Sequence, residues 1–160
     1  MQKITPCLWF NDDAEEAVNF YVKLFKNSKI GLITRYEGEA AKVAGKPAGS
    51  VLTIAFQLNG EEFTALNGGP LFKFSEAISF AVNCDTQKEI DDLWEKLSSG
   101  GEVQQCGWLK DRFGLSWQIV PTALPELLGG SPEATKRVMD AIMQMKKLDI
   151  KTLEQAYGAK

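Results

Sequence analysis

Hydrophobic and polar positions follow the same order in two separate parts of the chain. Residues 4–25 read as an apolar strand, an acidic turn and an amphipathic helix, and residues 78–97 repeat that order. In both helical parts the apolar residues recur at intervals of three or four, which places them on one helix face. More strand-like runs follow each copy. The pattern predicts two βαββ modules in tandem, with a concave sheet surface that suits a small molecule.

The first module carries local start and stop signals. Asp13, with Glu16 three residues later, has the spacing of a helix N-terminus. Strands are predicted over residues 30–36, 50–58 and 62–66. The last two of these flank Asn59-Gly60, the dipeptide that a type I′ hairpin turn prefers. Residues 37–49 are rich in Gly and Ala and have no strong period, so they predict a mobile loop.

The second module repeats these devices. Thr86 and Glu89 have the spacing of a capping box at the start of a helix, and the glycines after Ser99 end it. Strands are predicted over residues 77–84, 102–105 and 115–120. The modules span about residues 1–70 and 71–121.

Residues 122–160 predict a helical C-terminal extension. Ser131 followed by Pro132 is typical of a helix start. Behind it runs an apolar stripe at helical spacing, formed by Val138, Met139, Ile142, Met145 and Leu148. The stripe is expected to cover part of its own sheet or of a neighbouring subunit's sheet; a mobile tail or an unknown partner for the stripe are the alternatives. Binding to a membrane surface is disfavoured because this helix lacks large aromatic residues and its charges are mixed.

Composition narrows the class of protein. The 160 residues are 44% hydrophobic, enough for one substantial core. The 18 basic and 21 acidic residues give a net charge of −3 without a Lys/Arg cluster, which argues against nucleic acid as a partner. No run of about 18 apolar residues indicates a membrane span, and no signal peptide is recognisable. A cytoplasmic location is the expectation.

Three cysteines, Cys7, Cys84 and Cys106, are widely spaced and include no CxxC pair. This favours free thiols over a disulfide framework. Cys7 and Cys84 fall in the first strand of each module and are expected to be buried. Cys106 is the thiol to test for reactivity, but the chain has no histidine to activate it as a nucleophile.

Four tryptophans are candidates for an aromatic pocket. Trp94 lies on the apolar stripe of a predicted helix and is expected in the core. Trp9 and Trp117 fall in strands, where either the core or a pocket wall suits them. Trp108, beside a glycine, is the best pocket candidate.

Three segments of the sequence resemble one known family. The runs LWFNDDAEEAVNFYVKLFKNS, ALNGGP and CGWLKDRFGLSWQIVP are similar to those of the PhnB-like branch of the vicinal oxygen chelate superfamily, the glyoxalase/bleomycin-resistance/dioxygenase group. Some members of the branch carry the label 3-demethylubiquinone-9 3-methyltransferase. The resemblance covers about residues 4–121 and implies a cup-shaped mixed sheet. It leaves the activity open, because this fold hosts isomerases, dioxygenases, thiol transferases and metal-free drug binders.

Enzymes of the superfamily usually hold a metal ion through His, Glu or Gln at four positions of the cup. Carried over by motif, these positions fall at Thr5, Asn67, Ser79 and Gln118. All four side chains are neutral, whereas a catalytic divalent ion needs about three ligands from His, carboxylate or thiolate. The resemblance therefore implies a cup without metal or cofactor that forms hydrogen bonds to a polar ligand.

The sequence thus predicts an α+β protein, a glyoxalase/bleomycin-resistance-like fold with tandem βαββ modules and a C-terminal helical tail. Its expected function is metal-independent binding of a small polar-aromatic molecule. The candidate ligand-binding residues are Thr5, Trp9, Asn67, Ser79, Trp108 and Gln118. The alternative is an enzyme of the lyase or dioxygenase type. Methyl transfer ranks lower because no glycine-rich turn follows the first strand, and βαββ modules do not build a doubly wound sheet.

A homodimer is also expected. Tandem modules leave exposed sheet edges, which invite pairing with another chain. The apolar stripe of the tail offers self-complementary surface for a two-fold contact, and members of the resembling superfamily commonly pair.

Overall fold

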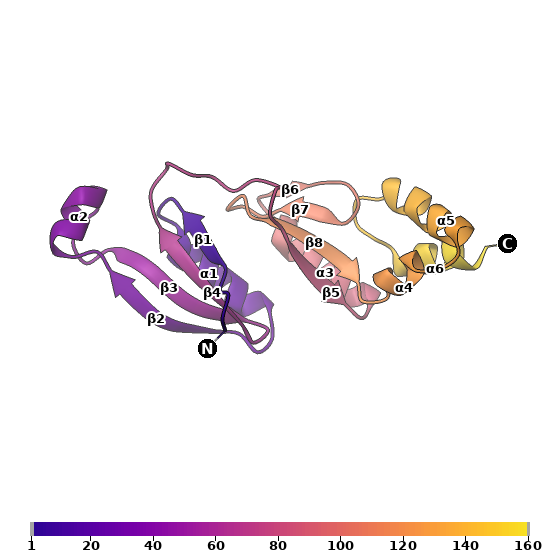
Figure 1. Cartoon of the computed structure of the whole chain (residues 1–160), viewed down its shortest axis with the longest axis horizontal. Helices are drawn as coiled ribbons and strands as arrows, with labels where there is room; N and C mark the ends of the chain where they lie inside the picture. The colour runs from indigo at the N-terminus through magenta and orange to yellow at the C-terminus, as the bar shows by residue number, and fades with distance from the viewer. Residues whose placement is uncertain (1, 160) are drawn as a thin grey trace. The chain divides into compact units, whose positions relative to one another are not determined.

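The computed structural model describes residues 2–159. Contacts between residues divide the chain into two units, Met1–Lys73 and Phe74–Lys160. Each unit contains a mixed four-stranded sheet with a helix on one face (Figure 1). None of the helices in residues 2–159 is long and apolar enough to cross a membrane.

The first unit is built from one strand, one long helix and three further strands. Its elements are β1 (Cys7–Phe10), α1 (Ala14–Leu24), β2 (Lys29–Arg35), α2 (Gly38–Ala44), β3 (Val51–Leu58) and β4 (Glu61–Asn67). The strand order is β1-β4-β3-β2, in which β1 and β4 are parallel and the other pairs are antiparallel. Asn59 and Gly60 both have positive φ, as the predicted type I′ turn between β3 and β4 requires.

The two faces of the first sheet differ in character. On β3, the alternate residues Ile54, Phe56 and Leu58 are buried under α1, which turns its own buried Val18 and Tyr21 to the sheet. Because side chains of a strand alternate between faces, Ala55 and Gln57 lie on the other face. We call this face, opposite α1, the first open face.

The loop predicted over residues 37–49 is wrong in part. Residues Gly38–Ala44 form the short helix α2, beyond one end of β2 and β3 (Figure 1). Gly45 ends the helix in the left-handed conformation, with φ of 63°. An ion pair between Lys46 and Asp12 ties this segment to the turn before α1.

The second unit repeats the topology of the first. Its sheet elements are β5 (Phe80–Cys84), α3 (Gln87–Ser98), β6 (Glu102–Val103), β7 (Trp108–Lys110) and β8 (Ser116–Pro121). The order β5-β8-β7-β6 has one parallel pair, β5 with β8, in the position of β1 with β4. The predicted internal repeat and the α+β class are confirmed, with one strand more per module than the βαββ order.

Helix α3 starts at the capping box predicted from Thr86 and Glu89: the Thr86 hydroxyl accepts from the Glu89 amide, and the Glu89 carboxylate accepts from the Thr86 amide. Its buried Ile90 and Leu97 pack toward β7 and β8. Trp117 is 3% exposed and belongs to this core, where its indole N–H donates to the Asp111 carboxylate at 2.9 Å. Of the two interpretations of Trp117, the one that places it in the core is therefore confirmed. We call the face opposite α3 the second open face.

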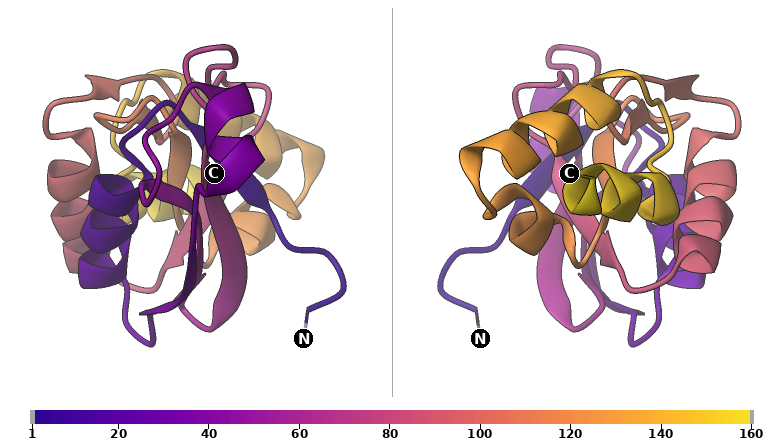
Figure 2. Two further views of the ribbon diagram at one scale, coloured as in Figure 1. Left: turned by 90° about the vertical axis from the view of Figure 1, so that its left-hand side faces the viewer. Right: turned by 90° about the vertical axis from the view of Figure 1, so that its right-hand side faces the viewer.

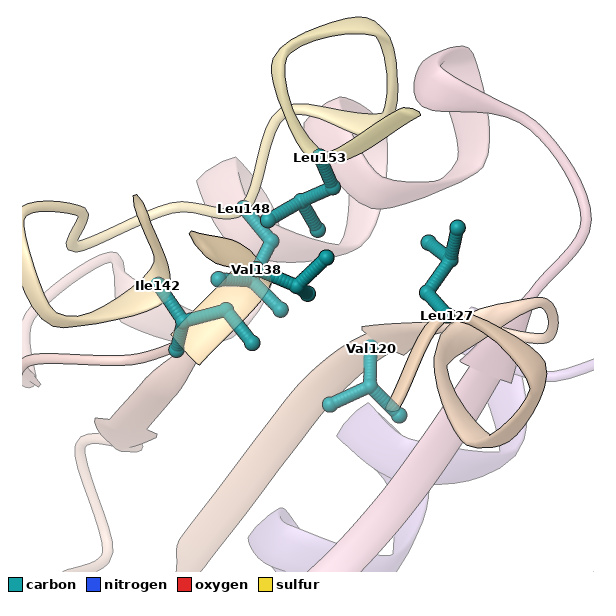
Figure 3. Close-up of a cluster of buried hydrophobic side chains, with 6 residues drawn as sticks. All are labelled: Val120, Leu127, Val138, Ile142, Leu148 and Leu153. Atoms are coloured by element: carbon teal, nitrogen blue, oxygen red, sulfur yellow. The ribbon is translucent and has the colours of Figure 1, made fainter. Parts of the chain in front are cut away.

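Three helices complete the second unit: α4 (Leu124–Leu128), α5 (Pro132–Met143) and α6 (Ile150–Gly158). Helix α4 was not predicted, whereas α5 starts at Ser131 and Pro132 as expected. The right-hand view of Figure 2 shows the three helices gathered together, and all three pairs are in contact. Their buried side chains meet the end of β8 in one cluster (Figure 3), formed by Val120, Leu127, Val138, Ile142, Leu148 and Leu153.

Polar contacts clamp the tail to α3. The Gln87 side chain donates to the Leu148 carbonyl at 3.1 Å and accepts from the Ile150 amide at 2.9 Å. Lys147 forms an ion pair with Asp91 at 2.6 Å.

Val138, Ile142 and Leu148 of the apolar stripe are buried against Val120 at the end of β8 in their own unit, whereas Met139 is 42% exposed. The expectation that the tail covers part of its own sheet is confirmed for the buried residues.

All three cysteines are free thiols. Cys84 is buried as predicted, and burial, with the nearby Glu89 and Asp85 charges, raises its pKa to about 11. The prediction of a buried Cys7 is wrong: Cys7 is exposed, because Leu8 and Phe10 occupy the α1 face of β1 and place Cys7 on the first open face.

Candidate functional site

Three of the predicted ligand-binding residues come together on the second open face. Gln118 in β8 donates from Nε2 to the Ser79 hydroxyl at 2.9 Å. Trp108 in β7 is the register partner of Gln118 across the antiparallel β7–β8 pair. Side chains directly opposite in such a pair lie on one face within contact range. All three residues are partly exposed, so a polar group and an indole ring share one accessible patch.

An ion pair borders this patch and was missed by sequence reasoning. Lys110, two residues after Trp108 on the same face, contacts Glu76 at 2.5 Å. Gln104 also donates to the Glu76 carboxylate, at 3.1 Å. The hydrogen bond from Lys110 lowers the pKa of Glu76, and the same bond raises the pKa of Lys110. Both groups therefore stay charged near neutral pH, and their charges cancel.

Ser116 was also missed, and it is the register partner of Lys110. It is fully buried, and its hydroxyl has no hydrogen-bond partner among residues 2–159. A buried hydroxyl without a partner is destabilising, on the order of 1–3 kcal/mol. Alternation along β8 places Ser116 on the same face as Gln118, so an unused donor lies beside the patch.

The first unit has a cavity of its own, of about 330 Å³. Thr5 is the predicted residue that lies there. Gly31 and Ala55 of its lining lie close together, because a Cβ added to Gly31 would come within 3.2 Å of the Ala55 carbonyl oxygen. The full lining consists of Thr5, Lys29, Gly31, Ala55, Phe56, Gln57, Glu62, Phe63 and Thr64. No sequence motif pointed to Lys29, Gln57 or Glu62, because the strand register brings them together.

Trp9 is engaged within the first unit. Its indole N–H donates to the Gly69 carbonyl at 2.9 Å, and its ring meets Phe72 edge-on at 4.9 Å between centroids. A Cβ on Gly68 would lie 2.2 Å from the ring. The ring therefore fixes β1 to the segment that follows β4.

Asn67 lies on the α1 face and is 6% exposed. Its side-chain oxygen accepts from the Ala14 amide at 3.0 Å, and its side-chain nitrogen donates to the Val51 carbonyl at 3.2 Å. Asp13, predicted to cap α1, makes no side-chain cap bond. Asn67 thus supplies from β4 the cap that was expected from Asp13.

The donor groups do not fit a resident divalent metal ion. The positions that hold the metal ion in enzymes of the resembling superfamily are occupied here by the neutral side chains Thr5, Asn67, Ser79 and Gln118. Within residues 2–159 no three His, Cys, Asp or Glu side chains are grouped closely enough to hold an ion. Neutral oxygens alone leave the charge of a divalent ion uncompensated.

A nucleotide-type cofactor such as S-adenosylmethionine does not fit either. Strand β1 leads through Asn11, Asp12 and Asp13 directly into α1, where a glycine-rich turn would be needed to approach the cofactor closely. Each sheet has a single parallel pair, so neither is a doubly wound sheet.

Comparison with known proteins gives one family match and several structural matches. The family model described as 3-demethylubiquinone-9 3-methyltransferase matches residues 2–120. A solved structure described as a putative 3-demethylubiquinone-9 3-methyltransferase, PhnB protein, from Bacillus cereus is 37% identical. The match covers 74% of this chain and 99% of that one, with a TM-score of 0.66. None of the curated proteins compared with the chain matches it.

More distant structures share the fold alone. A protein from Pseudomonas aeruginosa is 20% identical over 76% of this chain and 98% of its own, with a TM-score of 0.59. The fosfomycin resistance protein FosX from Mesorhizobium loti is 13% identical over 81% of this chain and 100% of its own, with a TM-score of 0.55.

Proposed function

Because the chain belongs to the 3-demethylubiquinone-9 3-methyltransferase family of PhnB-like proteins, within the vicinal oxygen chelate superfamily, we propose that it binds a small, uncharged, partly aromatic molecule without a resident metal ion. The observation that carries the proposal is the patch of Ser79, Trp108 and Gln118 on the second open face.

The patch has the chemistry to hold such a ligand. The indole of Trp108 offers a face for stacking a planar ring. The Gln118 amide uses Nε2 toward Ser79 and accepts no hydrogen bond through Oε1 within residues 2–159, so Oε1 is available to a ligand N–H or O–H. Lys110 is paired with Glu76 and also lies in the field of Glu102, so its positive charge is not free to attract an anionic ligand.

Methyl transfer, which the family label names, is not part of the proposal. The segment after β1 and the strand order of both sheets do not fit S-adenosylmethionine, and the carried-over positions do not fit the metal of lyases and dioxygenases of the fold. The likeness to FosX, at 13% identity, concerns the fold.

A thermal-shift screen with a panel of neutral aromatic compounds tests the proposal, followed by calorimetric titration of the best hit. Gln118→Ala and Trp108→Ala should weaken binding by about 1–3 kcal/mol each, the range for a lost buried hydrogen bond or stacking contact. Gln105→Ala, at an exposed position outside the patch, is the matched control and should leave affinity unchanged. If no compound class raises the unfolding midpoint, the proposal fails.

The proposal extends to a cytoplasmic homodimer, for which sheet edges are the supporting feature. Strands β1, β2, β5 and β6 are the outer strands of their sheets, and unpaired edges favour pairing with a second chain. The tail stripe no longer supports a dimer, since Val138 and Ile142 are buried within their own unit. Light scattering coupled to size exclusion at micromolar concentration decides between dimer and monomer.

A further inference from the structure

We propose that the Ser116 hydroxyl is a specificity-determining contact of the ligand patch. The patch then takes a neutral aromatic ring that carries a hydroxyl at one end and a carbonyl oxygen at the other. This assignment rests on the proposed function of the patch and names the chemical class of its ligand. It starts from Ser116 Oγ, a buried side-chain oxygen without a hydrogen-bond partner in the part of the chain that the structure describes.

Ser116 lies in the row of side chains that forms the patch. Successive side chains of β8 alternate between the two faces of the sheet. Trp117 belongs to the core under α3, so its neighbours Ser116 and Gln118 are on the second open face. In the register of β7 with β8, Lys110 stands opposite Ser116, and Trp108 stands opposite Gln118. The hydroxyl, the indole and the amide therefore share one face.

In the free protein the Ser116 hydroxyl has lost water without gaining a partner. The residue is 0% exposed. Folded proteins contain few such groups, and a ligand that completes the hydrogen bond is one physical reason for keeping one. Because the hydroxyl is already dehydrated, a ligand oxygen that accepts from it gains a buried hydrogen bond without further desolvation of the protein.

The two ends of the patch have opposite hydrogen-bonding character. Ser116 offers an O–H donor, whereas Gln118 offers Oε1 as an acceptor, because Nε2 of the same amide donates to Ser79 at 2.9 Å. Residues two apart on a strand are separated by about 6.6–6.8 Å, a length that one benzene ring with a polar group at each end spans. The indole of Trp108 supplies the stacking surface beside Gln118. A ligand hydroxyl at Gln118 and a ligand carbonyl at Ser116 satisfy both ends.

Lys110 is the side chain that must move to admit the carbonyl end. It stands across from Ser116 and pairs with Glu76, and both members of this ion pair are partly exposed. Ion pairs between partly exposed groups hold their geometry weakly, and the lysine side chain has a flexible four-carbon stem. Lys110 can therefore shift while it stays close to Glu76.

A titration followed by the NMR signals of the ligand, which suits weakly bound small molecules, tests the assignment below neutral pH, where phenols are uncharged. Three compounds are compared: 4-hydroxyacetophenone has both polar groups, phenol has only the hydroxyl, and acetophenone has only the carbonyl. The parent should bind 4-hydroxyacetophenone most tightly. In Ser116→Ala the preference for this compound over phenol should fall at least about fivefold, the scale of one buried hydrogen bond. In Gln118→Ala its preference over acetophenone should fall instead.

The stability of Ser116→Ala is a second measurement, and it needs no ligand. Removal of an unpartnered buried hydroxyl should leave the free energy of unfolding in urea unchanged or raise it, whereas loss of a hydroxyl that serves the fold would lower it. Ser99→Ala is the matched control at an exposed position after α3. It should change neither the stability nor the preference among the three compounds.

Two results would overturn the role of Ser116 and leave the proposed function intact. One is that Ser116→Ala keeps the parent's preference for 4-hydroxyacetophenone over phenol. The other is that Ser116→Ala lowers the free energy of unfolding. If the parent binds none of the three compounds, the ligand class is wrong; the proposed function fails with it only if the wider panel of neutral aromatic compounds gives no binding either.

Discussion

Replacing Asn67 with alanine tests the cap that reaches α1 from β4. The change removes the hydrogen bonds to the Ala14 amide and to the Val51 carbonyl. Loss of an N-cap costs about 1 kcal/mol, and a second buried hydrogen bond contributes about 1 kcal/mol more. Ala14 is fully buried and Val51 is 4% exposed, so both backbone groups lose their partner away from water. The free energy of unfolding should fall by about 2–4 kcal/mol.

Asp13→Ala is the matched control, since Asp13 stands at the N-cap position without a side-chain cap bond. It should cost less than about 0.5 kcal/mol, the scale of a charge near a helix N-terminus. Asn67→Asp keeps the acceptor for Ala14 and should fall between the two. Urea unfolding followed by circular dichroism gives the three values. A loss for Asn67→Ala that is no larger than that for Asp13→Ala would refute the reasoning.

Three further predictions concern other positions. Gly68→Ala should lower the free energy of unfolding in urea by about 1–3 kcal/mol and alter tryptophan fluorescence, because the new Cβ would lie 2.2 Å from the Trp9 ring. The control Gly158→Ala, whose Cβ would have nothing within 4 Å, should leave the free energy of unfolding unchanged. Burial raises the pKa of Cys84 from 9.0 to about 11, so the folded state holds the thiol proton more tightly than the unfolded state. The stability that this group contributes is complete below pH 9 and is lost as pH rises toward 11. Cys84→Ala should flatten this fall in the free energy of unfolding, and equal pH profiles for the variant and the parent would contradict the prediction. Gln87→Ala removes the hydrogen bonds to the Leu148 carbonyl and the Ile150 amide, and should lower the free energy of unfolding by about 1–2 kcal/mol. Hydrogen exchange of the Ile150 amide should become faster; unchanged exchange there would show that the Gln87 bonds are not needed to hold the tail.

Sequence signals were sufficient wherever the interaction is local. The turn at Asn59-Gly60 and the capping box of Thr86 and Glu89 involve residues at most four apart, so their chemistry can be recognised in the sequence. The position of Cys7 was also within reach, because strict alternation with Leu8 and Phe10 places it on the opposite face. The short α2 was missed because its flanking glycines and Pro47 resemble a loop.

Signals failed where a partner comes from a distant strand. The cap of α1 was assigned to Asp13, whereas Asn67 provides it from β4. In the candidate site, motif resemblance found Ser79 and Gln118, which do contact each other. Glu76 and the unpartnered Ser116 were missed, since the register of β7 and β8 creates their environment.

The tail also bears on how the protein emerges from the ribosome. Val120 at the end of β8 is covered by residues from Leu127 to Leu153. Leu153 is made 33 residues after Val120 (153 − 120), and synthesis at about 5–20 residues per second places roughly 2–7 s between them. During that interval the apolar end of β8 lacks its cover. A nascent chain stalled before α5 should therefore bind chaperones, and it should dissociate from them once α6 has been synthesised.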